Sequence, residues 1–206
     1  MVIAIDGPAG AGKSTVARAV AQRLGFTYLN TGAMYRCVAL GTLESGDPAA
    51  EVAERSEMVI GDRVMLDGRD VTDAIRTPDV SARASEVARD PRVRAALVQR
   101  QQQLLATGDW VAEGRDIGVV VAPDAEVKVF LFADPAERAR RRADEHGADV
   151  ERVLAAQRER DARDHTEGRT VLEPAPDAVP VDTTALNVEQ VVDQIATLVV
   201  EAEELR

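Results

Sequence analysis

The sequence predicts an α/β fold: a doubly wound, five-stranded parallel sheet with helices on both faces, a small antiparallel insert and a helical lid. Short apolar runs, which are typical of buried parallel strands, alternate along the chain with segments of helical spacing. Strands linked through helices indicate a doubly wound sheet, with ligands bound outside the carboxyl ends of the strands. The expected strands cover residues 2–6, 26–29, 110–112, 127–132 and 179–181.

The middle of the chain has a different sequence pattern. Between residues 58 and 76, short β-like pieces are interrupted by Gly61-Asp62 and by Asp67-Gly68, and the last piece covers residues 70–72. Asp-Gly between alternating residues is a signal for a tight hairpin turn. The segment therefore predicts the small antiparallel insert.

Helix starts are indicated where a capping side chain precedes an amphipathic stretch. Asp134, Pro135 and Glu137 have the spacing of an N-cap, a first-turn proline and a capping box. Asn187 and Gln190 have the spacing of a second capping box. The expected helices cover about residues 14–24, a segment ending near 43, and residues 48–57, 78–89, 91–107, 135–147, 149–163 and 188–201, with Asp47, Thr77 and Asp90 among the caps.

The strongest motif lies between the first expected strand and the first expected helix. Residues 7–14 read G-x-x-x-x-G-K-S, and the strand-loop-helix context is the one that a phosphate-binding loop requires. Glycines let backbone N–H groups surround an anion, Lys13 would reach the β- and γ-phosphates, and Ser14 would ligate Mg²⁺. The alternative is a glycine-rich turn without a ligand. The loop residues expected at the nucleotide are Gly7, Pro8, Ala9, Gly10, Ala11, Gly12, Lys13, Ser14 and Thr15.

Composition bounds the other possibilities. The 206 residues suffice for one α/β core, and the net charge of −11 argues against a nucleic-acid surface over the whole protein. Cys37 is the single cysteine, which excludes an internal disulfide and a cysteine-rich zinc site. The sequence shows neither a long apolar run nor a secretory signal, so we expect a cytoplasmic protein without a membrane partner.

Several stretches resemble one family. Residues 31–36 (T-G-A-M-Y-R) are similar to a segment of nucleoside monophosphate kinases, and residues 113–118 (E-G-R-D-I-G) are similar to a segment of bacterial cytidylate kinases. Further similar stretches, spread between Ile3 and about Ile195, include residues 70–78, 84–94 and 123–128. The resemblance implies the P-loop NTPase fold and the ATP- and Mg²⁺-dependent phosphorylation of CMP and dCMP by in-line transfer.

The residue types support this reaction independently. Phosphoryl transfer depends mostly on positioning and charge neutralisation. A nucleotide phosphate is already largely dianionic near pH 7, because its second pKa is about 6. Cationic groups are therefore needed and a general base is not. The chain has two histidines, no recognisable nucleophilic triad, and arginines at the ends of expected elements.

By resemblance, the matching residues receive roles. Arg36 and Arg115 would hold the acceptor phosphate, with Thr31 where the family usually has Ser, and Ser85 and Arg94 would line the base pocket with Asp116. The lid would add Asp164, at the acceptor ribose, and Arg169, which stands near Glu167 where the family commonly has Arg. The residues expected to be catalytic are Lys13, Arg36, Arg115, Arg141 and Arg160.

Asp116 is the residue expected to select the base. Cytosine presents an N4 amino donor that a carboxylate accepts, whereas uracil presents a carbonyl oxygen at the corresponding position. The alternative is an ion pair between Asp116 and a neighbouring arginine.

A basic helix face indicates a lid over about residues 138–168. Arg138, Arg141 and Arg142 lie at i, i+3 and i+4, so they share a helix face after a strand end. We expect this face to close over the ATP phosphates, and an ordinary solvated surface is the alternative. By resemblance, Arg141 also lies near the adenine.

The remaining expectations concern metal, partners and organisation. Ser14 and Glu113 are the expected Mg²⁺ ligands, and Asp6 is a weaker candidate. ATP with CMP or dCMP are the expected substrates of a monomer. The alternatives are a related kinase that prefers UMP, a GTP-hydrolysing switch, whose Asn-Lys-x-Asp motif is absent here, and a silent binding protein. We expect one kinase domain, with its core at about 1–30, 108–134 and 178–206 and its acceptor-binding part at about 31–107.

Overall fold

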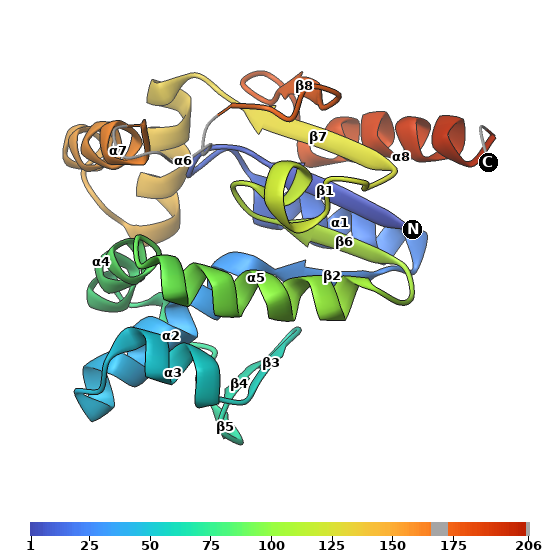
Figure 1. Cartoon of the computed structure of the whole chain (residues 1–206). Coiled ribbons are helices and arrows are strands. Elements are labelled where there is room, and N and C mark those ends of the chain that lie inside the picture. The colour runs from blue at the N-terminus through green and yellow to red at the C-terminus, as the bar shows by residue number, and fades with distance from the viewer. Residues whose placement is uncertain (166–172, 205–206) are drawn as a thin grey trace. The chain divides into compact units, whose positions relative to one another are not determined.

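The computed structural model describes residues 1–165 and 173–204, apart from the side chains of residues 145, 146 and 159–165. The chain forms two compact units, the first from Met1–Tyr28 with Asp109–Arg206 and the second from Leu29–Gly108 (Figure 1). The second unit has nearly the bounds expected for the acceptor-binding part, although that role stays a prediction. In the described part of the chain, no helix has the length and apolar character needed to cross a membrane.

A five-stranded sheet forms the centre of the fold, in the order β2-β6-β1-β7-β8. β1 pairs in parallel with β6 on one side and with β7 on the other, and β7 pairs in parallel with β8. This arrangement confirms the parallel α/β sheet. The strands are β1 (Val2–Asp6), β2 (Thr27–Asn30), β6 (Trp110–Glu113), β7 (Val127–Phe132) and β8 (Val179–Asp182).

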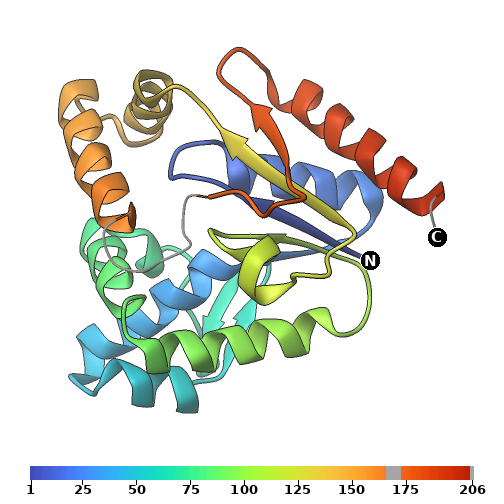
Figure 2. The same cartoon turned by 45° about the horizontal axis from the view of Figure 1, so that its top comes forward.

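The helices of the first unit supply much of its core. In α1 the buried residues Val16, Ala17, Val20 and Ala21 follow helical spacing, and this stripe joins a core that the sheet shares with α8. Figure 2 shows α1 and α8 lying side by side. These helices are α1 (Lys13–Leu24), α6 (Pro135–His146), α7 (Val150–His165) and α8 (Val188–Glu204), together with a single π-helical turn, η2 (Ile117–Val121).

The second unit packs helices with a three-stranded antiparallel sheet, β3-β4-β5. Asp67 and Gly68 both have positive φ, at 49° and 77°, as the tight turn predicted from Asp-Gly requires. The elements are α2 (Thr31–Ser45), α3 (Ala49–Arg55), β3 (Met58–Ile60), β4 (Val64–Leu66), β5 (Arg69–Asp70), η1 (Ala74–Arg76), α4 (Pro78–Val87) and α5 (Pro91–Leu105).

Local hydrogen bonds explain where elements differ from the expectation. The strand expected over 70–72 ends at Asp70, because that carboxylate accepts from both the backbone N–H and the hydroxyl of Thr72 and turns the chain. Asp47 does not cap α3, since its carboxylate pairs with Arg55. In α2 the helix begins directly at Thr31, capped by the side chain of Asn30, so the motif at 31–36 is helical throughout.

The two expected capping boxes have different outcomes. In α8, Asn187 Oδ1 accepts from the N–H of Gln190 and Gln190 Oε1 accepts from the N–H of Asn187, each at 2.9 Å. In α6, Asp134 caps as expected, accepting from the N–H groups of Ala136 and Glu137. The capping box itself is wrong there, because the Glu137 carboxylate accepts from two arginines of α6.

Candidate active site

The phosphate-binding motif lies between β1 and α1, as predicted. Gly7 has φ 147°, and a Cβ at this position would lie 2.0 Å from the carbonyl oxygen of Leu131, so the turn out of β1 accepts only glycine. Gly12 is the N-cap of α1, with φ 86°, and it has no side chain that could cap the helix. Lys13 curls over the loop, and its Nζ donates to the carbonyl of Pro8 at 2.8 Å. The loop thus turns a helix N-terminus and an ammonium group toward one concavity.

Two side chains from α6 and α7 hold this loop at the carbonyl of Ala9. Arg138 Nη1 and Gln157 Nε2 each donate to that oxygen at 3.0 Å. Both side chains are buried, with exposed fractions of 6% and 5%. Gly10, with φ 79°, allows this approach, since a Cβ there would lie 2.9 Å from Gln157 Nε2. Arg138 therefore belongs to the interior, whereas the sequence grouped it with arginines over the phosphates.

Oxygen ligands suited to magnesium meet at the start of α1. The Ser14 hydroxyl donates to Glu113 Oε2 at 2.9 Å, and the Tyr28 hydroxyl donates to Glu113 Oε1. Burial and the neighbouring Glu113 carboxylate raise the pKa of the Tyr28 hydroxyl. Among the side chains that the structure describes, which leave out those of residues 145, 146 and 159–172, no group of three or more His, Cys, Asp or Glu could hold a metal ion. A pair of oxygen ligands fits Mg²⁺ that arrives with substrate phosphates, because Mg²⁺ is usually bound by one or two protein groups and the phosphates together.

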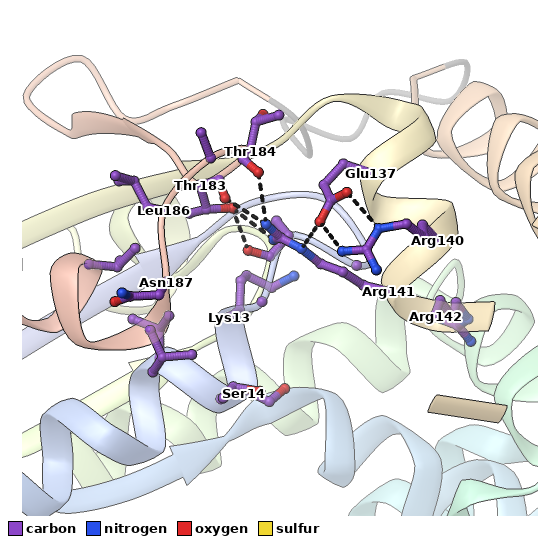
Figure 3. A pocket seen from close by; sticks show the side chains of 18 of the residues that line it. Lys13, Ser14, Glu137, Arg140, Arg141, Arg142, Thr183, Thr184, Leu186 and Asn187 are labelled. Carbon is purple, nitrogen blue, oxygen red and sulfur yellow. Dashed lines mark hydrogen bonds and ion pairs between the residues drawn. The ribbon is translucent and has the colours of Figure 1, made fainter. Parts of the chain in front are cut away.

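A cavity of about 790 Å³ opens beside the phosphate loop, wholly within the first unit. Figure 3 shows Lys13 and Ser14 on one side of it, and Arg141 between α6 and the segment after β8. The cavity is lined by the loop and the first turns of α1 (10–16), by α6 (Glu137, Arg140, Arg141, Arg142 and Asp144) and by the segment 183–188 with Val191.

Arg141 is held at the cavity wall by several acceptors. Its Nη2 donates to the carbonyl of Thr183 at 2.6 Å, and its Nε donates to Glu137 Oε1 at 2.8 Å (Figure 3). Hydrogen bonds from Arg140 and Arg141 lower the pKa of Glu137 to about 2. The fixed guanidinium thus adds positive charge beside the loop, at the place where the sequence put the nucleotide.

Asp6, the weaker metal candidate, binds backbone in the structure, and its metal role stays a prediction. Its Oδ1 accepts from the N–H of Ile117 and its Oδ2 accepts from the N–H of Gly118, both at 2.8 Å. Burial raises the pKa of Asp6 to about 6, although these two bonds favour the charged form. Both oxygens therefore hold the segment that follows Arg115 and Asp116.

The residues predicted for the acceptor fall in both units. Thr31 and Arg36 lie in the first turns of α2, Arg94 lies in α5, and the Ser85 hydroxyl donates to the carbonyl of Ser81 within α4 at 3.3 Å. Arg115 and Asp116 follow β6 in the first unit. Their roles stay predictions. Arg160 and Asp164 lie in α7, but their side chains are outside those described, and Glu167 and Arg169 lie outside the described residues.

Sequence reasoning missed Gln157 and Thr183. Gln157 lies in a helix that reads as charged and solvated, and nothing local indicates that its partner is 148 residues away. Thr183 follows β8, so the rule that ligands gather at the carboxyl ends of strands could have found it. Its hydroxyl lies 3.2 Å from the carbonyl of Ala11 in the phosphate loop, and it accepts from Arg141.

Solved structures with low sequence identity share this fold. A gluconokinase from Sinorhizobium meliloti aligns with a TM-score of 0.52 at 20% identity, covering 99% of this chain and 94% of that one. A shikimate kinase from Bacteroides thetaiotaomicron aligns with a TM-score of 0.52 at 13% identity, covering 97% and 98%. These likenesses confirm the predicted fold class.

Sequence comparison identifies the family. The family model described as cytidylate kinase matches residues 3–201. A cytidylate kinase from Solibacter usitatus is 44% identical, over 97% of this chain and 92% of its own length. A cytidylate kinase from Pelotomaculum thermopropionicum is 47% identical, over 96% and 95%. With a phosphate loop of the required geometry and a match that runs nearly from end to end, the chain belongs to the cytidylate kinase family.

Proposed function

We propose that this chain phosphorylates CMP, and also dCMP, with ATP as the donor. The observation that carries the proposal is the phosphate loop, with Lys13 and the Ser14–Glu113 pair beside a cavity large enough for a nucleotide. Membership in a family whose named relatives are cytidylate kinases supports a phosphotransferase with CMP as acceptor.

The donor would occupy the cavity of the first unit. Backbone N–H groups of residues 7–15 would surround its β- and γ-phosphates, and Lys13 and Arg141 would neutralise their charge. Ser14, with Glu113 acting through water, would hold Mg²⁺, which supplies charge neutralisation when it is bound. The segment 183–188 would lie along the adenosine end of the cavity.

The acceptor residues proposed from the sequence complete the reaction. Arg36 and Arg115 would bring the acceptor phosphate into line against its repulsion by the donor. The phosphate dianion attacks without a general base, since its second pKa is about 6. Thr31 would assist at the phosphate, Ser85, Arg94 and Asp116 would bind the base, and Arg160, Asp164 and Arg169 would act from the lid.

The test is a coupled assay of ADP release with ATP-Mg²⁺ and CMP, dCMP, UMP or AMP. We expect turnover with CMP and dCMP far above that with UMP and AMP. Turnover led by UMP would keep the phosphate chemistry but refute the base assignment, and silence with all four would refute the kinase proposal. ATP consumption without an acceptor would favour a nucleotide-hydrolysing switch.

Asp116 provides the sharper test of base selection. Asp116→Asn should flatten the preference for CMP over UMP, because the amide offers both a donor and an acceptor. An unchanged ratio would favour the structural ion pair instead. The cytoplasmic location and the monomeric state expected from the sequence stay predictions.

A further inference from the structure

Asp6 is a buried carboxylate that the proposed reaction does not use. It ends β1 and directly precedes Gly7 of the phosphate loop, and only 7% of its surface is exposed. Its two oxygens accept from two successive backbone N–H groups, of Ile117 and Gly118, each at 2.8 Å. A buried carboxylate whose two oxygens each accept from a backbone N–H group fixes that backbone firmly, because leaving either partner unsatisfied is costly.

The backbone it fixes is the short segment that carries Arg115 and Asp116. On the preceding side, the N–H of Gly114 donates to the carbonyl of Ile5 at 3.0 Å. On the following side, Asp6 binds the next two N–H groups. Arg115 and Asp116 are thus held between two attachments to consecutive residues of β1.

Asp6 also caps the N-terminus of η2, which the side chain of Asp116 would otherwise do. Asp116 is the N-cap of η2, where an aspartate commonly accepts hydrogen bonds from its own helix. Its backbone has φ −145° and ψ 28°, and its side chain makes no capping bond. Because Asp6 caps the turn from the neighbouring strand, the Asp116 carboxylate is not used for capping.

We propose that Asp6 is a positioning residue for the acceptor: from the base of the donor loop, it sets the placement of Arg115 and the orientation of the Asp116 carboxylate. This inference rests on the proposed function, since it gives Arg115 and Asp116 their roles at the acceptor. It predicts that disturbing Asp6 impairs acceptor recognition more than ATP binding, although Asp6 is adjacent in sequence to the ATP-binding loop.

The test compares Asp6→Asn with a matched control, Asp134→Asn. Asparagine keeps the shape but offers one oxygen, so its NH₂ group would face the N–H of Ile117 or of Gly118. Asp134 is an exposed aspartate two residues beyond the end of β7, and it accepts from two backbone N–H groups through Oδ1 alone. Asparagine therefore replaces it without loss.

The measurements are KM for CMP, KM for ATP, and the ratio of kcat/KM for CMP over UMP, at pH 7.5. For Asp6→Asn we expect KM for CMP to rise about tenfold and the ratio to fall, with KM for ATP changed less than about threefold. Asp134→Asn should leave all three unchanged. Equal rises in both KM values, or a change confined to kcat, would overturn the proposal.

The choice of pH matters because the CMP phosphate also titrates near pH 6. A loss of activity below that pH would not distinguish substrate from Asp6. In the wild-type protein, amide NMR gives a second measurement that needs no variant. We expect the Ile117, Gly118 and Asp116 amide resonances to move together as Asp6 titrates, and immobile Asp116 resonances would overturn the proposal.

The two proposals fail separately. If wild-type protein turns over no acceptor, the proposed function fails, and the NMR titration still decides whether Asp6 controls the Asp116 segment. If the wild type prefers UMP, only the base assignment fails, and the split between acceptor KM and ATP KM still decides the role of Asp6. If Asp6→Asn does not fold, Asp6→Glu can be used instead, because glutamate keeps both oxygens on a longer side chain. It should likewise raise KM for CMP more than KM for ATP.

Discussion

The inner side of the phosphate loop and the rim of the cavity beside it each use an arginine of α6, one buried and one exposed. On the inner side, Arg138 and Gln157 are buried and bind one backbone carbonyl, that of Ala9. On the rim, Arg140 binds Glu137 and Asp144 on the surface of α6 and is 58% exposed. A buried polar bond cannot be replaced by water, whereas an exposed ion pair can.

This difference predicts unequal energies. Removing a partner from a buried group costs about 1–3 kcal/mol, because the remaining group stays desolvated. An exposed ion pair contributes about 0.2–1 kcal/mol and is screened by salt. The inner side should therefore determine stability and geometry, and the rim should contribute little beyond local charge.

The largest expected effect belongs to the group on the loop itself. Lys13→Met should lower kcat by about 100-fold or more, because it removes the cation that we propose stabilises charge developing during transfer. Arg23→Met is the matched control in the same helix, since Arg23 is exposed and pairs only with Asp193 among the interactions described. Initial rates with saturating CMP measure both. A kcat for Lys13→Met within a few-fold of the wild type would contradict the proposed phosphate contact.

The inner side can be tested by a double-mutant cycle on Arg138 and Gln157. Arg138→Met should lower the free energy of unfolding by about 2 kcal/mol, since it removes a buried charged donor. Gln157→Leu should cost less, about 1 kcal/mol, because the hydrogen bond that it removes comes from a neutral donor.

The double variant is the decisive measurement. Each single change leaves the carbonyl of Ala9 with one of the two donors described, and both changes together leave it with neither. In urea denaturation, we expect the double variant to lose about 1 kcal/mol more of the free energy of unfolding than the two single variants lose together. Additive losses would show that the shared carbonyl does not couple α6 and α7.

The sequence predicted those parts of the fold and site whose signals are local. The phosphate loop is one contiguous motif in a strand-loop-helix context, and the Asp67-Gly68 turn contains its own conformational requirement. The capping box at Asn187 and Gln190 closes within four residues. Each could be found by spacing alone.

The parts that the sequence missed depend on distant partners. The turn η2 is capped by Asp6, which lies 111 residues before Ile117, so no pattern around residues 117–121 predicts it. The expected capping box at Glu137 does not form, because the carboxylate binds arginines one turn later instead. Sequence spacing cannot predict which of these partners the carboxylate binds. Burial of Arg138 likewise follows from its distant Ala9 partner rather than from helix periodicity.

The pH dependence of the unfolding free energy should have opposite signs for Asp6, at the base of the phosphate loop, and for Glu137, on the rim. The pKa of Asp6 is raised from 3.8 to about 6, so the folded state binds this proton more tightly than the unfolded state. The contribution of Asp6 to the free energy of unfolding is therefore most favourable below about pH 4, and it falls by about 3 kcal/mol as the pH rises through 6. The measurement is the difference in unfolding free energy between the wild type and Asp6→Asn from pH 4 to 7. A difference that does not change with pH would contradict the burial of an ionised Asp6.

Glu137 on the rim should show the opposite sign. Its pKa is lowered from 4.5 to about 2 by Arg140 and Arg141, so its contribution is present above pH 4.5 and is lost as pH falls toward 2. Comparison of the wild type with Glu137→Gln between pH 2.5 and 6 measures it. A stability difference that grows as the pH falls would contradict this assignment.

The smallest expected effect is that of Arg140→Gln on the rim. Arg140 donates through Nη2 and Nε to the two oxygens of Glu137, at 2.8 and 2.9 Å, and such a bidentate pair favours the upper part of the range for exposed pairs. Arg141 still neutralises Glu137 after the substitution, so we expect a loss below about 1 kcal/mol in low salt. In 1 M salt, where the screening length is about 3 Å, this loss should disappear, while that of Arg138→Met should persist. If the two substitutions had equal costs and equal salt dependence, exposure would not be what distinguishes the rim from the inner side of the loop.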